Sequence, residues 1–354
     1  MEGDDCFMVI GFCRTLARRF RTLSVALVVI ALVLSACGGE TGGATQPPAV
    51  IEGQTFNLMM STQMAPGSPI VDGFYVWAES VYERSGGRLV IDVFPSAQLG
   101  SDEDVIEQAQ QGLNVAVLTD GGRMATFVPD IGIIGMAYIA ENYDDVLAIT
   151  QTDVFAEWTQ ELANDHGLRI INFNWFDGAR HFLTNTPIHT PANLSGIRIR
   201  TPGAPVWATS VESMGATPVA MPWGETYNAI QTGVVDGAEA QHTASYAARL
   251  QEVVSYIIKT YHFQLVNGIV VGEDWFNSLP QDLQVILVEE AVAAASESAR
   301  IIEAMADELE ASMVADGMTV IEPDVEAFRQ AAEAAYEALG FTELRERILS
   351  EIGR

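Results

Sequence analysis

The sequence feature that most constrains the fold is an alternation of strand and helix patterns between residues 55 and 118. Three short apolar stretches have the composition of strands, and they are Thr55–Met60, Leu89–Val93 and Leu113–Leu118. Two helical patterns separate them, one beginning at Ser68-Pro69 and the other at Ser101, because a Ser side chain can accept hydrogen bonds from the first turn of a helix. This strand–helix–strand–helix–strand order predicts an α/β fold with a parallel sheet.

A second region of mixed patterns lies at Leu194–Gln241. Its first strand, Ile197–Arg200, carries two Arg side chains on one face because their positions are two apart. Its last strand ends in the acid-rich sequence Val234–Glu239, and two helical patterns begin between these strands, at Pro205 and Pro222. We interpret this stretch as one wall of a ligand cleft.

Longer elements are expected in the remainder of the chain. We predict a helix over Asp145–Ala163 and strands over Leu168–Phe173 and Leu265–Val271. From Ser278–Gln281, which resembles a capping box, a helical pattern continues to about Asp316. A helical run of this length exceeds an ordinary globular helix, so it is either broken or bridges two domains.

The N-terminal region has the pattern of an export signal. Basic residues precede the apolar stretch Leu23–Leu34, which is too short to span a bilayer comfortably. The sequence Leu34-Ser35-Ala36-Cys37 follows directly and resembles the bacterial lipobox, in which the Cys is acylated and becomes the first mature residue. We therefore expect a signal peptide over residues 1–36 and a lipidated, flexible tether over residues 37–52 that holds the protein to a membrane. The alternative is an ordinary signal peptide that contains a Cys.

The charge of the chain narrows the possible partners. The 354 residues include 18 basic and 47 acidic side chains, which gives a formal net charge of −29. A surface of this sign repels DNA and RNA, so we expect no nucleic-acid binding. The acidity either keeps the protein soluble or is an adaptation to salt.

Recognisable catalytic and metal-binding patterns are missing from the sequence. It has no GxSxG, GxxxxGKS/T or HExxH motif, its five His lie far apart, and Cys37 is its last Cys. We therefore predict no catalytic residues, no metal site and no cofactor. For the same reason we expect no internal disulfide in the mature protein.

Two Arg and one Asp are the binding candidates that the residue patterns suggest. Arg180 and Arg200 lie beside expected cleft-facing turns, and a guanidinium can hold a carboxylate through two parallel hydrogen bonds. Either Arg could instead pair with one of the many surface acids. Asp120 follows the third strand, where ligands of open α/β sheets bind, or it is a turn residue before Gly121-Gly122.

Six sequence motifs occur in an order that is typical of one protein family. They are Phe94–Gly100, Gly178–Arg180, Asn185–Ile188, Gly196–Pro202, Met214–Pro218 and Met221–Glu239. Together they resemble the DctP family, the solute-binding proteins of tripartite ATP-independent periplasmic (TRAP) transporters, and the similarity runs from about Thr55 to Phe341. It implies an α/β, two-domain, periplasmic-binding-protein-like fold with a central cleft and a long helix crossing both domains. The expected domains are residues 53–175 plus 266–300 and residues 176–265 plus 310–340, followed by a tail at 341–354.

The resemblance also implies roles for particular residues. The Arg that binds the carboxylate of the ligand falls on Arg200, a second Arg near the ligand falls on Arg180, and an aromatic side chain over the ligand falls on Trp223. The other expected ligand-binding positions are Asp120, Gln63, Asn267 and Glu239. Members that bind sialic acid carry Asn after the Asp-Gly-x-Glu motif, and Ala240 in its place argues against that ligand.

The resulting hypothesis is a binding protein without catalytic activity. It would capture a small organic acid, a carboxylate or a sulfonate, in a closing cleft and deliver it to TRAP membrane permease subunits. The expected location is the periplasm or the outer face of the cytoplasmic membrane. Two alternatives stay open, an exported α/β enzyme that acts on an organic acid and a ligand-sensing subunit of a membrane receptor.

Overall fold

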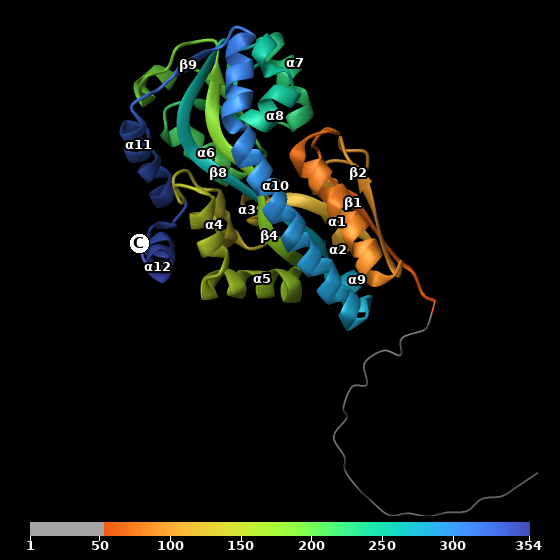
Figure 1. Ribbon diagram of the computed structural model, residues 1–354. Coiled ribbons are helices and arrows are strands. Elements are labelled where there is room, and N and C mark those ends of the chain that lie inside the picture. Colours follow the sequence, from red (N-terminus) through yellow and green to blue (C-terminus); the bar gives the residue numbers. More distant parts are fainter. Residues whose placement is uncertain (1–52) are drawn as a thin grey trace, which may run out of the picture. The chain divides into compact units, whose positions relative to one another are not determined.

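The computed structural model describes residues 53–354, whose strands form one mixed, nine-stranded sheet. The order across the sheet is β2-β1-β3-β8-β4-β7-β5-β6, and β9 pairs with β8 outside this order (Figure 1). The strands are β1 (Phe56–Ser61), β2 (Leu89–Phe94), β3 (Val115–Asp120), β4 (Leu168–Thr184), β5 (Arg198–Thr201), β6 (Thr217–Ala220), β7 (Gly237–Gln241), β8 (Tyr256–Gly272) and β9 (Thr319–Ile321). The expected signal peptide, Cys37 and the tether lie outside the described residues.

Helices connect the strands and pack on the sheet. They are α1 (Pro69–Ser85), α2 (Asp102–Gln110), α3 (Gly121–Met124), α4 (Tyr143–Thr150), α5 (Asp153–His166), α6 (Pro205–Ser213), α7 (Thr226–Gln231), α8 (His242–Ala247), α9 (Glu273–Ser278), α10 (Gln281–Ala315), α11 (Val325–Ala338) and α12 (Thr342–Glu351). Within residues 53–354, none of the helices combines the length and the apolar character that crossing a membrane requires.

The α/β pattern predicted for the first half of the chain is confirmed. β1 pairs in parallel with both β2 and β3. Ser68 caps α1, and Ser101 forms a capping box with Asp104 at the start of α2. Because β1 and β3 are parallel, their carboxyl ends lie at one edge of the sheet, where Gln63 follows β1 and Asp120 ends β3.

Two long antiparallel strands, β4 and β8, join the two halves of the sheet. Each has 17 residues, so the strands predicted over Leu168–Phe173 and Leu265–Val271 were too short. The register between β4 and β8 shifts at several points, and one shift lies between Phe176 and Gly178. Such bulges bend a strand without ending it, which explains why the loop-like sequence around Asp177 still belongs to β4.

The second half of the chain repeats the α/β arrangement. β5 pairs in parallel with β6 and β7, and β5 and β7 overlap the first and last strands predicted in Leu194–Gln241. β7 also pairs with β4 in antiparallel orientation, and this pairing attaches the second half to the long strands. The sheet is therefore mixed and not purely parallel.

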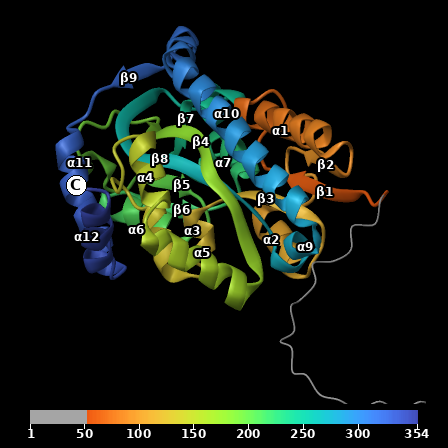
Figure 2. The same cartoon turned by 60° about the horizontal axis from the view of Figure 1, so that its bottom comes forward.

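Helix α10 is one unbroken helix of 35 residues. It packs against α1, β4 and α8, so it spans elements of both halves (Figures 1 and 2). The capping box expected at its start is wrong, because Ser278 ends α9 and its hydroxyl donates to the Trp275 carbonyl while Pro280 occupies the N-cap. The single helix expected over Asp145–Ala163 is also wrong, because Thr152 caps a separate helix, α5. The expected C-terminal tail contains α12.

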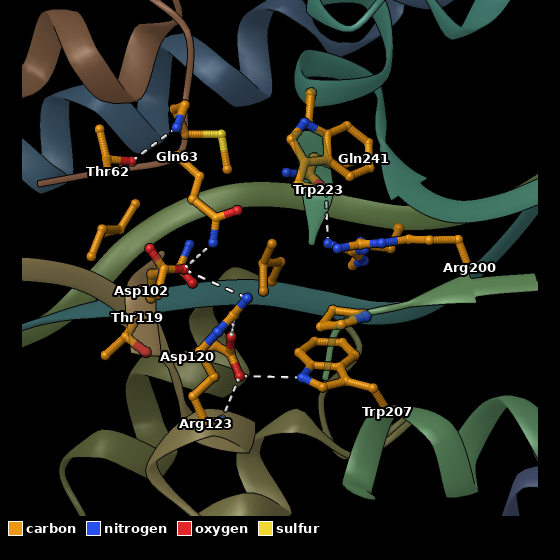
Figure 3. A pocket seen from close by; sticks show the side chains of 17 residues that line it. Thr62, Gln63, Asp102, Thr119, Asp120, Arg123, Arg200, Trp207, Trp223 and Gln241 are labelled. Atoms are coloured by element: carbon orange, nitrogen blue, oxygen red, sulfur yellow. Dashed lines mark hydrogen bonds and ion pairs between the residues drawn. The ribbon is translucent and has the colours of Figure 1, made fainter. Parts of the chain in front are cut away.

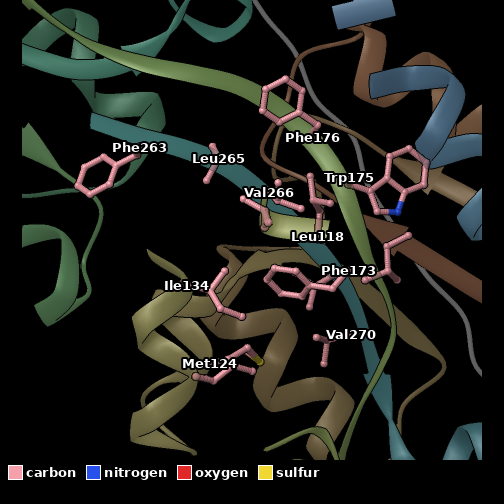
Figure 4. Packing of buried hydrophobic residues seen from close by; sticks show 14 of the residues in the cluster. Leu118, Met124, Ile134, Phe173, Trp175, Phe176, Phe263, Leu265, Val266 and Val270 are labelled. Atoms are coloured by element: carbon pink, nitrogen blue, oxygen red, sulfur yellow. The ribbon is translucent and has the colours of Figure 1, made fainter. Parts of the chain in front are cut away.

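Large aromatic side chains fill the core where β4 crosses the molecule (Figure 4). Trp175 is fully buried and packs edge-to-face on Phe74 of α1, with 4.6 Å between the ring centroids. Gly73 makes this approach possible, since a Cβ there would lie 2.9 Å from the Trp175 ring. The contact fixes β4 against the first half of the chain next to the strand ends that carry the candidate site.

Candidate functional site

A pocket of about 560 Å³ lies at the strand ends of both halves (Figure 3). Six of the seven predicted ligand-binding residues line it, and they are Gln63, Asp120, Arg180, Arg200, Trp223 and Asn267. The seventh, Glu239, is fully buried behind Arg180 and does not line the pocket, contrary to the expectation. The structure thus brings together residues more than 200 positions apart, from Gln63 to Asn267.

Arg200 is a buried cation without a carboxylate partner. Its side chain, on β5, is 2% exposed, and every other Lys and Arg within residues 53–354 forms an ion pair. Its Nε and Nη2 atoms donate to the Met221 carbonyl oxygen at 3.1 and 2.8 Å, and the guanidinium carbon lies 5.2 Å from the Trp223 ring centroid. Both N–H groups of Nη1 and one of Nη2 remain free, so a carboxylate can accept one N–H from each of these two nitrogens.

The protonation of Arg200 reflects the same surroundings. Burial lowers the pKa of Arg200 to about 9, and the attraction of Glu239 offsets this effect only in part. The nearby cation Arg180 lowers the pKa further. Arg200 therefore stays charged at neutral pH, but in a site where the protein itself does not balance the charge.

Arg180 is held mainly by other protein groups. Its Nε and Nη2 atoms donate to the two carboxylate oxygens of Glu239, Nη2 also donates to the Glu239 backbone carbonyl at 2.7 Å, and Nη1 donates to Gln241 Oε1 at 3.0 Å. One N–H of Nη1 is left for a ligand. Burial opposes the charge on Glu239, but Arg180 and His262 together outweigh burial and hold the pKa of Glu239 below its ordinary value. Glu239 thus positions and neutralises Arg180.

Asp120 is both a turn residue and a pocket residue, so the two roles offered as alternatives for it in the sequence analysis are compatible. Its Oδ1 caps α3 by accepting from the Arg123 amide at 3.0 Å, and its carboxylate also pairs with the Arg123 side chain. The same oxygen accepts from Trp207 Nε1 at 3.2 Å, which connects the two halves of the chain. Gly122 is required in this turn, because a Cβ there would lie 2.5 Å from the Trp207 nitrogen.

Asp102 and Arg123 complete this wall of the pocket, and the sequence reasoning missed both. Arg123 Nη2 lies 3.5 Å from Asp102 Oδ2, and Gln63 Nε2 donates to the same oxygen at 2.6 Å. Burial raises the pKa of Asp102 to about 6, although Arg123 opposes this shift. The place of Asp102 in the first turn of α2, the helix that follows β2, was a usable signal, since such helix starts lie at the ligand edge of an α/β sheet. Trp207, which was also missed, lies in the first turn of α6 after β5 and carried the same signal.

Neutral polar groups fill the rest of the wall. Asn267 on β8 is the register partner of Asp120 on β3, and the Thr119 hydroxyl is buried without a hydrogen-bond partner in the described part of the chain. Among residues 53–354, no cluster of His, Cys, Asp and Glu has the arrangement of a metal site. The pocket therefore presents hydrogen-bonding groups and one unpaired cation to a polar ligand.

Sequence comparison relates the chain to bacterial solute-binding proteins. The sequence model for "bacterial extracellular solute-binding protein, family 7", DctP, matches residues 60–342. The sialic acid-binding periplasmic protein SiaP of Vibrio cholerae is 25% identical over 281 residues, which cover 79% of this chain and 87% of that protein.

Solved structures of TRAP periplasmic solute-binding proteins share the fold. An open structure without ligand from Escherichia fergusonii has 36% sequence identity and a TM-score of 0.75, and the match covers 83% of this chain and 99% of that one. A structure from Ochrobacterium anthropi with bound L-fuconate has 31% identity and a TM-score of 0.81, with 84% and 99% covered. These matches confirm the predicted fold class.

Proposed function

Because this chain belongs to family 7 of the bacterial extracellular solute-binding proteins, the DctP family, we propose that its pocket captures a small organic acid for the permease of a TRAP transporter. Members of the family are solute-binding proteins and not enzymes. One observation carries the proposal: Arg200 is buried in the pocket wall, with free N–H groups and no carboxylate partner. A buried cation is unfavourable until an anion balances it, and an acidic ligand would supply that anion.

The opposite wall favours a ligand with one acidic group and several hydroxyls. Asp102 and Asp120 share one cation there, Arg123, so this wall has an excess of negative charge. A second carboxylate on the ligand would be repelled by it, whereas hydroxyl groups could donate to the two Asp side chains and to Asn267. L-fuconate, the ligand in the Ochrobacterium anthropi structure, has this combination of groups.

Closure of two domains on the ligand completes the proposal. One domain comprises residues 53–175 plus 266–300, and the other comprises residues 176–265 plus 310–340. Two observations support this division: the pocket walls come from both groups of residues, and the bulged pairing of β4 with β8 lies between them. A bend at these bulges would move one wall toward the other and exclude water from the ion pair with Arg200.

We also propose that Cys37 becomes the lipidated N-terminus after removal of residues 1–36. The support is the sequence Leu34-Ser35-Ala36-Cys37 and the periplasmic location of the relatives. Residues 37–52 would then tether the binding domains to a membrane, next to the permease.

A thermal-shift screen of the purified mature protein tests the proposed function. The compounds are L-fuconate, succinate, sialic acid and an alkyl sulfonate, and the neutral sugar L-fucose is the matched control. We expect L-fuconate to raise the Tm and L-fucose to leave it unchanged, because only the acid can pair with Arg200. Equal stabilisation by L-fucose, or no stabilisation by any of the acids, would contradict the proposal.

A further inference from the structure

Asp177 is a buried carboxylate that does not line the ligand pocket. It is 2% exposed, belongs to the bulged part of β4 and forms no ion pair within residues 53–354. Its Oδ2 accepts from Gln241 Nε2 at 2.5 Å, and its Oδ1 accepts from the Thr243 hydroxyl at 3.2 Å. Burying a carboxylate without an ion pair costs free energy, so its presence here calls for an explanation.

The hydrogen bonds that lead from Asp177 to the pocket have one consistent direction. Arg180 can only donate, so the Gln241 atom that faces its Nη1 is the carbonyl oxygen Oε1. The amide nitrogen of Gln241 then faces Asp177, which as a carboxylate can only accept. Asp177 thereby fixes the orientation of the Gln241 amide, and Gln241 fixes one of the two N–H groups on Arg180 Nη1.

We propose that Asp177 is a positioning residue for the ligand site and acts through Gln241 on Arg180. Glu239 and Gln241 occupy four of the five N–H groups of Arg180, so the second N–H of Nη1 is the donor that remains for a ligand. The guanidinium is planar, and therefore the hydrogen bond to Gln241 sets the direction of this last donor. The inference rests on the proposed function, in which Arg180 contacts the bound acid.

The backbone beside Asp177 is adapted to this contact. Gly178 has φ +117°, a conformation that side-chain-bearing residues rarely adopt, and a Cβ there would lie 3.2 Å from the Gln241 Cβ. Any larger residue would therefore strain β4 and crowd Gln241. The close approach between β4 and β7 at Gln241 depends on this glycine.

The surroundings of Asp177 bring the protonation of its carboxyl group into the neutral pH range. Asp177 is near enough to Arg180 to be influenced by its charge, and it lines a second cavity of about 460 Å³. The other charged or titratable groups of that cavity are His181 from β4, His242 from α8, Lys259 and Tyr261 from β8, and Asp307 and Glu310 from α10. Burial raises the pKa of Asp177 to about 7, although Arg180 opposes the shift. Its bond from Gln241 should weaken as the pH falls through about 7, because a protonated carboxyl is a poorer acceptor.

Side-chain NMR of the ligand-free mature protein tests the positioning directly. The probes are the Gln241 amide and the Arg180 Nε–H, compared in wild type, Asp177→Asn and Asp177→Ala. Asn keeps a neutral acceptor for Gln241 and can donate to the Thr243 hydroxyl, so at about pH 6, where wild-type Asp177 is mostly protonated, Asp177→Asn should leave both signals near their wild-type positions. Asp177→Ala should move both. The Gln241 signal should titrate between about pH 6 and 8 in wild type and stay constant in Asp177→Asn.

Calorimetry with L-fuconate measures the consequence for binding. Asp177→Ala should weaken affinity roughly tenfold, and Asp177→Asn should stay within about threefold of wild type. Gln241→Met removes the connecting amide but keeps Asp177, so it should weaken binding at least as much as Asp177→Ala, because Gln241 also lines the pocket. If Asp177→Ala does not fold, the pH dependence of the Gln241 signal in wild type and Asp177→Asn decides the role of Asp177.

Two results would overturn the role of Asp177. One is unchanged Gln241 and Arg180 signals in Asp177→Ala, and the other is an equal loss of affinity in the Asn and Ala variants. If L-fuconate does not bind the wild type, the proposed ligand class is wrong, and the NMR comparison then decides the role of Asp177 by itself.

Discussion

Arg200→Met should weaken ligand binding strongly while making the ligand-free protein more stable. Burial lowers the pKa of Arg200 to about 9, so keeping the guanidinium charged in the folded state at pH 7 costs on the order of a few kcal/mol. The substitution leaves the Met221 carbonyl without its two hydrogen bonds, which costs about 1–3 kcal/mol. We therefore expect a net gain on the order of 1 kcal/mol, which raises the Tm by a few °C.

The direction of the pKa shift sets the pH range of this effect. The pKa of Arg200 is lower in the folded than in the unfolded state, so the charge destabilises the fold at every pH below about 9. Above about pH 9 the folded wild type begins to lose the proton, and the advantage of Arg200→Met should shrink. Scanning calorimetry of wild type and Arg200→Met at about pH 7 and about pH 10 measures the difference in stability at each pH.

The same variant should lose affinity for L-fuconate. Removing one partner of a buried, hydrogen-bonded charge pair costs about 2–5 kcal/mol, which is roughly 30-fold to several-thousand-fold in Kd. Arg200→Lys is the matched control, because it keeps the charge but loses the planar pair of donors, and its loss should be smaller. An affinity of Arg200→Met within about threefold of wild type would remove Arg200 from the site, and a lower Tm would show that its charge is balanced without a ligand.

Three further predictions concern other parts of the chain. Cys37→Ser should move the protein from the membrane fraction to the soluble fraction of cells, and an unchanged distribution would refute the lipid anchor. Gly178→Ala should lower the free energy of unfolding by about 1–3 kcal/mol in chemical denaturation, because of its positive φ, whereas Gly203→Ala, which meets no neighbouring atom, should have little effect. Asp102→Asn should raise affinity for succinate about threefold to tenfold in calorimetry, because it removes negative charge facing the second carboxylate. A loss of affinity would argue against repulsion of the second carboxylate by the wall that Asp102 and Asp120 form.

Local sequence signals predicted most elements of the fold but not the lengths of the longest ones. Ser68 and Ser101 marked helix starts correctly, because a cap depends on residues within one turn. β4 and β8 were predicted too short because their bulged centres contain polar residues such as Asp177 and Asn267, which look like loop residues until tertiary packing buries them. The Ser278 signal failed because its hydroxyl ends one helix instead of starting the next.

In the candidate site, too, the positions of residues could be predicted from the sequence but their contacts could not. Residues at strand ends, such as Asp120 and Arg200, could be placed in a cleft from topology and from the family resemblance. The difference between Arg200 and Arg180 could not be predicted, because it depends on Glu239 and Gln241, which become neighbours of Arg180 only when β7 pairs with β4. The position of Glu239 behind the pocket was missed for the same reason.

A crystal structure of the mature protein with L-fuconate tests the central claim most directly. We predict that the two carboxylate oxygens lie within about 2.7–3.0 Å of Nη1 and Nη2 of Arg200, with the ligand hydroxyls toward Asp102 and Asp120. A complex in which the carboxylate contacts other groups, and Arg200 remains bound only to the Met221 carbonyl, would contradict the account.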